Sequence, residues 1–302
     1  MDNIEVIGID HGFSQMKTVS STFTSGVAEI TTEPAFFDDV LEYKGRFYKI
    51  GGSRMEVRAT KTETDEYYLL TLAAIAKELH KRGKRKANVV LAVGLPATRY
   101  GDEKQDFIDY LSRNKDVCFR FEQYDYHVNI VKVSAYPQCY AAVVDRIGTF
   151  GTKVVVVDIG SWTIDIIPVI NRKPDDAKTN TIQQGLITCM RDINKQSVRK
   201  LGDEIDETDI QHYMIHGTSS LPQEYIEIID KSLKEFTAMI YNSLREEKYN
   251  MKTTPFVFVG GGAVVMKNFG GYEQGNISYN LDVRANAKGY ETLARISMRK
   301  EL

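Results

Sequence analysis

Residues 154–167, VVVVDIGSWTIDII, contain the strongest structural signal in the chain. The run of valines before Asp158 predicts a strand that is covered on both faces. Asp-Ile-Gly-Ser is typical of a turn, in which Gly160 can adopt a positive φ or let a phosphate approach the backbone. The stretch therefore predicts a hairpin whose Asp158 faces a metal-bound phosphate. A plain β-hairpin, in which this aspartate only caps the turn, is the alternative.

A second copy of this design stands near the N-terminus, in residues 4–18, IEVIGIDHGFSQMKT. An apolar strand leads to Asp10 and Gly12, a polar turn contains Ser14, and Lys17 enters the next strand. Two such hairpins in one chain indicate an internal duplication.

A third glycine-rich element, residues 256–263, has the sequence FVFVGGGA. It predicts a buried strand that ends in Gly260, Gly261 and Gly262, and these three glycines leave room for a flat ring.

In this order, the motifs resemble those of the actin-type ATPase fold shared by actin, bacterial actin-like proteins, sugar kinases and DnaK-type chaperones. The resemblance spans most of the chain. It concerns two phosphate loops (10–17 and 158–165), an adenosine motif (260–263) and two interdomain connections (136–147 and 285–290). The small residues of the second connection would allow close packing and hinge motion.

Within the superfamily, the chain is most similar to plasmid-segregation actins of the ParM type. Three stretches outside the loops carry this resemblance: YKGRFYKIGG (43–52), DEYYLLTLAAIAKEL (65–79) and VVLAVGLP (89–96). The resemblance implies an α/β protein with the two-domain actin-like ATPase fold, built from duplicated ribonuclease-H-like domains with nucleotide in the cleft. Domain I would comprise residues 1–148 and 284–302. Domain II would comprise residues 149–283, with a small peripheral subdomain at about 186–222.

The resemblance also implies a site for ATP or ADP with Mg²⁺. Asp10 and Asp158 would hold the hydration shell of the metal, because Mg²⁺ keeps several waters and binds through few carboxylates. Lys17 would reach the β- and γ-phosphates as a point charge, and an outward strand residue is the alternative. The expected nucleotide-binding residues are Gly12, Phe13, Ser14, Lys17, Gly160, Ser161, Thr163, Gly260, Gly261 and Gly262.

Gln138 is expected to govern hydrolysis, with Asp10 and Asp158 completing the catalytic set. Pro137 suits a first helical position, so a helix is predicted to begin there and to direct its N-terminus toward an anion. Many ParM-like relatives carry Glu at the matching place, whereas actin uses Gln in this region. An amide cannot take a proton as a carboxylate does, but it can orient an attacking water. General-base catalysis is therefore left open.

Other candidates carry weaker signals. His11, beside Asp10, could contact phosphate or fill the turn. His212 and His216 have the spacing of two metal ligands on one helix face, but no third ligand is evident nearby. Trp162 is expected to pack against a domain face rather than to stack on a base.

Composition restricts the class of protein. The net charge of -2 and the pI near 6.3 argue against a protein that coats DNA by itself. The three scattered cysteines, Cys118, Cys139 and Cys189, indicate reduced, buried thiols rather than disulfides or a zinc site. Neither a signal peptide nor an apolar run of the ~20 residues that cross a bilayer is evident, which predicts a cytoplasmic protein without membrane attachment.

Periodicity predicts the remaining elements. Helices are expected at 65–81, 107–111, 187–201 and 224–246, strands at 89–93 and 128–133, and hairpin turns at 24–26 and 43–45. The basic run 81–86 is expected to be a solvated loop rather than a nucleic-acid patch.

The resemblance implies a function. The expected protein forms filaments in an ATP-dependent way and would drive segregation of plasmid or other mobile DNA through a DNA-bound adaptor of the ParR type, without binding DNA directly. The alternative is a non-filamentous ATPase or kinase of the same superfamily, either a small-molecule kinase or a chaperone-like ATPase.

Overall fold

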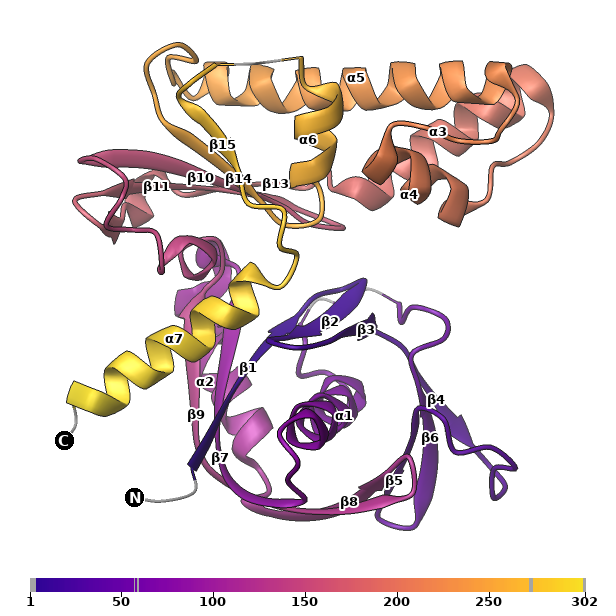
Figure 1. Cartoon of the computed structure of the whole chain (residues 1–302), viewed down its shortest axis with the longest axis vertical. Coiled ribbons are helices and arrows are strands. Elements are labelled where there is room, and N and C mark those ends of the chain that lie inside the picture. Colours follow the sequence, from indigo (N-terminus) through magenta and orange to yellow (C-terminus); the bar gives the residue numbers. More distant parts are fainter. Residues whose placement is uncertain (1–3, 57, 59, 272–273, 301–302) are drawn as a thin grey trace. The chain divides into compact units, whose positions relative to one another are not determined.

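The computed structural model describes residues 4–56, 58, 60–271 and 274–300, and the chain divides into two compact units (Figure 1). The first unit comprises Met1–Arg146 with Arg284–Leu302, and the second comprises Ile147–Val283. Each unit has its own sheet and its own hydrophobic core. The predicted α/β fold class with two domains is therefore confirmed.

The first unit is built on a sheet with the strand order β3-β2-β1-β7-β9-β8-β5-β6-β4. Its strands are β1 (Ile4–His11), β2 (Gln15–Thr18), β3 (Thr22–Thr24), β4 (Val27–Ile30), β5 (Val40–Tyr43), β6 (Arg46–Ile50), β7 (Lys86–Leu95), β8 (Asp116–Phe121) and β9 (Tyr124–Pro137). The central strands β1, β7 and β9 run parallel, and β1 and β2 form the predicted first hairpin.

Of the two hairpin turns predicted in this sheet, one is present and the other is not. The turn between β5 and β6 is a hairpin as predicted, because Lys44 and Gly45 both adopt the positive φ that a tight two-residue turn requires. The hairpin predicted at residues 24–26 is wrong, since β3 pairs with β2 and β4 pairs with β6. Gly26 instead lies in the connection between β3 and β4, the two edge strands of the sheet. A Cβ at this position would lie 2.5 Å from the carbonyl oxygen of Gly51.

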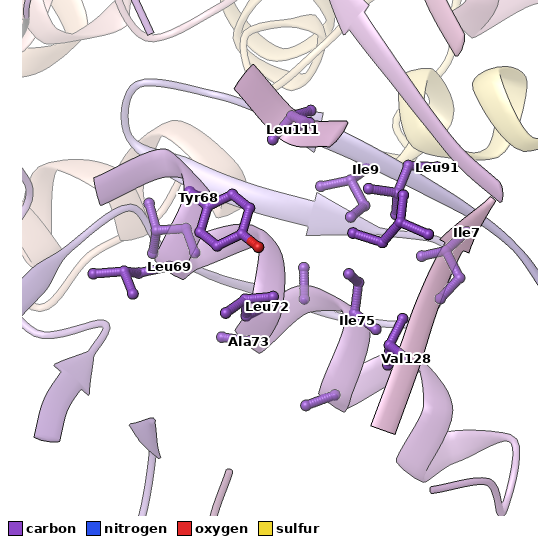
Figure 2. Packing of buried hydrophobic residues seen from close by; sticks show 14 of the residues in the cluster. Ile7, Ile9, Tyr68, Leu69, Leu72, Ala73, Ile75, Leu91, Leu111 and Val128 are labelled. Carbon is purple, nitrogen blue, oxygen red and sulfur yellow. The ribbon is translucent and has the colours of Figure 1, made fainter. Parts of the chain in front are cut away.

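Helix α1 (Glu66–Lys81) lies inside this curled sheet (Figure 1), which explains why it is buried on nearly every side. One face of the helix, formed by Leu72, Ile75, Ala76 and Leu79, is fully buried. Figure 2 shows Leu72 and Ile75 among residues of β1, β7, β9 and α2 (Tyr100–Ser112), with Ile7, Ile9, Leu91, Val128 and Leu111 labelled. Because the sheet surrounds the helix, a single stripe of apolar residues is not sufficient, and Tyr68 and Leu69 are buried as well.

The helix predicted to begin at Pro137 is wrong. Strand β9 continues through Pro137, which pairs with Leu95 of β7, and the backbone N–H of Gln138 donates to Leu95 O at 2.9 Å. Cys139 then adopts a φ of 61°, which interrupts any helix, and only the short 3₁₀ turn η2 (Ala141–Val143) follows. The pairing with β7 outweighs the local preference of proline for a helix start.

Helix α7 (Ala285–Lys300) returns to the first unit and packs against β1 and η2. A Cβ at Gly8 would lie 2.0 Å from the carbonyl oxygen of Ala287, and one at Gly289 would lie 1.9 Å from that of Ala141. The close packing predicted for the small residues of this segment is confirmed. In addition, the buried N–H of Cys139 donates to Oδ1 of Asn286 at 3.1 Å, so two segments distant in sequence are joined.

The second unit contains a sheet with the order β12-β11-β10-β14-β15, in which β13 also pairs with β11. Its strands are β10 (Lys153–Ile159), β11 (Ile164–Ile170), β12 (Lys173–Pro174), β13 (Asn180–Ile182), β14 (Phe256–Val259) and β15 (Ile277–Tyr279). Its helices are α3 (Leu186–Leu201), α4 (Glu207–His216), α5 (Gln223–Glu246) and α6 (Ala263–Phe269). The predicted hairpin is β10–β11, and the helices predicted at 187–201 and 224–246 are α3 and α5.

Two further expectations concern cysteines and membrane segments. The three cysteines are free, but the prediction that they are buried is wrong for Cys118, because β8 alternates and turns this side chain outward. Within the described ranges, no helix has the length and apolarity needed to span a membrane.

Candidate functional site

The predicted site residues form two groups, one in each unit. We call them the Asp10 cluster (Asp10, Lys17, Lys61 and Gln138) and the Asp158 cluster (Asp158, Gly160, Gly260 and Gly262). Each cluster is built on an aspartate in the C-terminal part of a central strand, either β1 or β10.

Asp10 is 2% exposed and has two side-chain partners. Lys17 lies directly opposite it on β2 and places Nζ 3.1 Å from Oδ2, so this lysine points to the loop rather than outward. Gln138 donates from Nε2 to Oδ1 at 3.0 Å. Burial raises the pKa of Asp10, but the charges of Lys17 and Lys61 and the two hydrogen bonds outweigh it, and the pKa lies below its ordinary value. Asp10 is therefore a buried carboxylate at neutral pH.

The turn after β1 is held tightly by its neighbours. A Cβ at Gly12 would lie 2.6 Å from Gln15 O and 3.7 Å from Nζ of Lys17. Ser25, which the sequence did not single out, donates from Oγ to Gly12 O at 2.7 Å and from its backbone N–H to Ser14 O at 3.0 Å. Glycine is thus required at position 12, and the loop backbone is fixed in place.

His11 belongs to the core rather than to the site surface. It is fully buried, its Nε2 lies 2.9 Å from Oγ1 of Thr71 in α1, and its ring meets Phe107 edge-on. Burial, together with the charge of Lys61, lowers the pKa of His11 to about 3, so the ring is neutral. Of the two roles considered for His11, the structure fits the filling of the turn.

Lys61 is the main residue of the Asp10 cluster that the sequence did not reveal. It lies in the segment before α1, is 6% exposed, and places its ammonium between 5.7 and 5.9 Å from the ring centres of Phe13, Tyr67 and Phe107. Burial lowers the pKa of Lys61 to about 8, even though the nearby charge of Asp10 raises it. A lysine between two threonines gives no sequence signal of burial.

The Asp158 cluster has a comparable turn. Gly160 N–H donates to Thr163 O at 2.9 Å, and the start of α3 holds the loop, because the N–H groups of Leu186 and Ile187 donate to the carbonyls of Gly160 and Ser161. Gly185, also missed in the sequence, is needed here: a Cβ would lie 2.5 Å from the backbone nitrogen of Trp162. The Thr163 hydroxyl donates to Asp165 at 3.2 Å.

The glycines after β14 pack against the same loop. Gly260 has a φ of 80°, and a Cβ there would lie 2.2 Å from Oδ1 of Asp158; a Cβ at Gly262 would lie 2.1 Å from Cγ2 of Ile159. A Cβ at Gly261 would meet its nearest neighbour, Leu186, at an ordinary 3.6 Å. Two of these glycines are therefore explained by packing within the unit, in addition to any space they leave for a ligand.

The donor set suits Mg²⁺ held mainly by water and phosphate. In the described part of the chain, no three or more His, Cys, Asp and Glu side chains gather as a ready metal site. The His212 and His216 rings do lie side by side, with centroids 4.4 Å apart, but they form no such group. Because the Asp10 carboxylate already accepts from Lys17 and Gln138, contact with a hydrated Mg²⁺ through water fits this residue better than direct ligation.

Comparison with protein families finds matches in both halves of the chain. Residues 8–140 match the N-terminal domain of actin like proteins. Residues 156–269 match the C-terminal domain of the archaeal actin homologue MreB-like family. No curated protein sequence shows a significant match.

Several solved structures share the fold over nearly the whole chain. An archaeal actin homologue, Ta0583, in complex with ADP has a TM-score of 0.76 and 20% identity, over 96% of this chain and 99% of that chain. ParM from Bacillus thuringiensis with ATP has a TM-score of 0.73 and 13% identity, over 99% and 100%. A 15-stranded ParM filament from Clostridium botulinum has a TM-score of 0.75 and 17% identity, over 97% and 99%.

Proposed function

The chain belongs to the actin-like protein superfamily, and we propose that it is an ATPase that assembles into filaments when it binds ATP and Mg²⁺. The observation that carries the proposal is the pair of Asp-x-Gly turns, one in each unit, each with its aspartate buried in a central strand. A single loop of this kind is common, but two in a fold of this family favour nucleotide binding.

Phosphoryl transfer requires positioning and charge neutralisation more than covalent catalysis. Asp10 and Asp158 would hold Mg²⁺ through its waters, and Lys17 would approach the β- and γ-phosphates. When bound, Mg²⁺ supplies neutralisation of the phosphate oxygens. Gln138 would orient the attacking water, since its amide nitrogen is already engaged by Asp10 and its amide oxygen can accept from a water.

Two structural relatives support the proposal, one its filament part and the other its nucleotide part. One is a ParM that was solved as a 15-stranded filament, and another is a ParM with ATP. By analogy with such plasmid-segregation actins, filaments of this chain would separate plasmid or other mobile DNA in the cytoplasm.

A DNA-bound adaptor of the ParR type would make the link to DNA. The chain has a net charge of -2, and three cations of the basic run 81–86 already have partners: Arg82 forms ion pairs with Glu5, Glu78 and Glu291. Lys84 forms an ion pair with Glu5, and Arg85 donates to the Tyr126 hydroxyl at 2.6 Å while it stacks on Tyr124. Few of the cations in this loop are left for a phosphate backbone, so weak binding of the purified protein to duplex DNA at physiological salt is expected.

High-speed sedimentation and light scattering test the proposal. The protein is mixed with Mg-ATP, Mg-ADP or no nucleotide over a range of concentrations, and phosphate release is followed on the same samples. We expect reversible assembly above a critical concentration with Mg-ATP, and none for Asp158→Ala. Asp106→Ala, which removes an exposed carboxylate on α2, should behave as the parent. A monodisperse protein under all nucleotide conditions would contradict the filament proposal, and ATP turnover that rises with an added metabolite would favour a kinase.

A further inference from the structure

Lys61 has an unusual environment for a lysine. It is 6% exposed, although the segment that contains it precedes α1 at the surface of the unit. Its position is fixed by the segment itself, because the Thr60 N–H donates to Glu63 Oε1 at 2.9 Å and the hydroxyls of Thr60 and Thr62 lie 3.2 Å apart. Ordering and burying a lysine is costly unless its charge meets a partner.

The described residues compensate the charge of Lys61 only in part. Three ring faces, from Phe13, Tyr67 and Phe107, attract the ammonium. Over the residues described, however, Lys61 makes no hydrogen bond and has no carboxylate within 4.0 Å. Asp10, the charge that most raises the pKa of Lys61, accepts a hydrogen bond from Lys17 at its Oδ2 instead.

The surrounding charges also leave Lys61 short of an anion. Asp10 and Glu103 attract it, Lys17 and Arg99 repel it, and His11 is neutral. Asp10 also accepts hydrogen bonds from Lys17 and Gln138, so among the described residues Lys61 has no carboxylate to itself, and both lysines lie beside Gly12 or Phe13 of the first loop. An additional anion at this loop would remove the imbalance, and a phosphate group suits two ammonium groups and a turn backbone.

We propose that Lys61 is a phosphate-binding residue of the first loop, which contacts the phosphate chain of a bound adenine nucleotide together with Lys17. This inference rests on the proposed nucleotide-binding function. The aromatic rings hold the stem and ammonium in position before the ligand arrives, so little side-chain freedom is lost on binding. Lys61 therefore acts in binding, and it has no covalent role.

The control residue is Lys77 in α1. Its ammonium also lies over two rings, those of Phe23 and Phe121, but it pairs with Asp39 at 2.7 Å, away from the Asp10 cluster. Lys77→Met therefore removes a lysine of similar surroundings whose charge is already satisfied. Lys61→Met, Lys61→Gln and Lys61→Arg complete the set.

Affinities for adenosine, ADP and a non-hydrolysable ATP analogue, each with Mg²⁺, are measured by titration calorimetry on the full chain. Thermal unfolding without nucleotide is measured in parallel. We expect Lys61→Met and Lys61→Gln to bind the analogue at least roughly tenfold more weakly while adenosine binding is unchanged. Lys61→Arg should recover much of the loss, and Lys77→Met should bind as the parent. Without nucleotide, Lys61→Met should melt no lower than the parent, because methionine removes a buried charge and keeps the stem.

Two results would overturn the inference while leaving the proposed function intact. One is parental affinity of Lys61→Met and Lys61→Gln for both ADP and the analogue. The other is an equal loss of affinity for adenosine, which would assign Lys61 a purely structural role. Absence of nucleotide binding by the parent chain is a distinct result, and it would overturn the proposed function and this inference together.

Discussion

Gln138 donates a hydrogen bond from Nε2 to Oδ1 of Asp10 over 3.0 Å, and it does so from the end of strand β9 rather than from a helix. The other oxygen of the same carboxylate is 3.1 Å from Lys17. The orientation of the Gln138 amide is therefore set by a buried charge, and no helix dipole is needed to place this residue beside the first loop.

Replacement of Gln138 by alanine should separate assembly from hydrolysis. If the amide orients the lytic water and does little to hold ATP, Gln138→Ala should keep nucleotide binding and polymerisation while it slows phosphate release by ~10²-fold or more. Filaments should then persist, which light scattering and phosphate release on one sample will reveal. Gln105→Ala removes a similar amide-to-aspartate bond on the surface of α2 and is the control. Unchanged phosphate release with a normal filament lifetime would remove Gln138 from the mechanism.

The two loop aspartates should differ in how far their loss reduces turnover. Asp158→Ala is expected to abolish ATP hydrolysis, and Asp10→Ala to weaken it severely, because each removes a carboxylate that would position hydrated Mg²⁺. Loss of Asp10 also leaves Lys17 and Lys61 without their shared anion. Hydrolysis at the parental rate by either variant would show that the loop assignment is wrong.

Replacement of glycine by alanine should have opposite effects on the stability of the protein at Gly289 and at Gly101. At Gly289 a Cβ would lie 1.9 Å from the carbonyl oxygen of Ala141, so Gly289→Ala should destabilise the protein by about 1–3 kcal/mol. At Gly101 in α2 a Cβ would meet nothing within 4 Å, and Gly101→Ala should stabilise by about 0.5–1 kcal/mol. Urea unfolding of both variants measures the difference, and equal effects would argue against the close packing of α7.

Acid stability should depend on Glu78, a buried carboxylate of α1. Burial raises the pKa of Glu78, but hydrogen bonds from Ser20 at 2.7 and 2.8 Å and the nearby charge of Arg82 outweigh it, and the pKa lies below its ordinary value. A lowered folded-state pKa means that the unfolded state binds more protons, so this stabilisation is present above the unfolded pKa of about 4.3 and disappears as the pH falls through the folded value.

Glu78→Gln should therefore cost about 1–3 kcal/mol at pH 7, since it weakens charge-assisted hydrogen bonds. The gap between variant and parent should narrow in urea unfolding below about pH 4. A gap that stayed constant down to pH 3 would show that the ionised carboxylate makes no contribution.

Local patterns predicted most elements of this fold because they depend on short-range preferences. Apolar spacing revealed α1, α3 and α5, and the Asp-x-Gly turns revealed both hairpins. The error at Pro137 has a clear physical origin: proline is compatible with both a helix start and the end of a strand, and the pairing partner that decides, Leu95, is distant in sequence. The positive φ of Cys139 has no signal in the residue type.

The site was predictable only where its residues lie within the loops themselves. Lys61, Ser25 and Gly185 reach the clusters through long-range packing, and none belongs to a local motif. Gly260 and Gly262 were correctly singled out as glycines, but the contacts that require them, with Asp158 and Ile159, come from a different strand. Roles in catalysis and metal binding stay predictions until the variants are measured.

The path of α7 also has a consequence for synthesis. This helix completes the apolar cluster of Val6, Val90 and Ala92 with Tyr290 and Ala294, yet it follows the whole second unit in sequence. While a ribosome translates the chain, β1 and β7 emerge early and keep an uncovered apolar surface until residues 285–300 have been made. The unit whose synthesis begins first is therefore completed last, and nascent chains that stop before residue 285 should require chaperone protection to remain unaggregated.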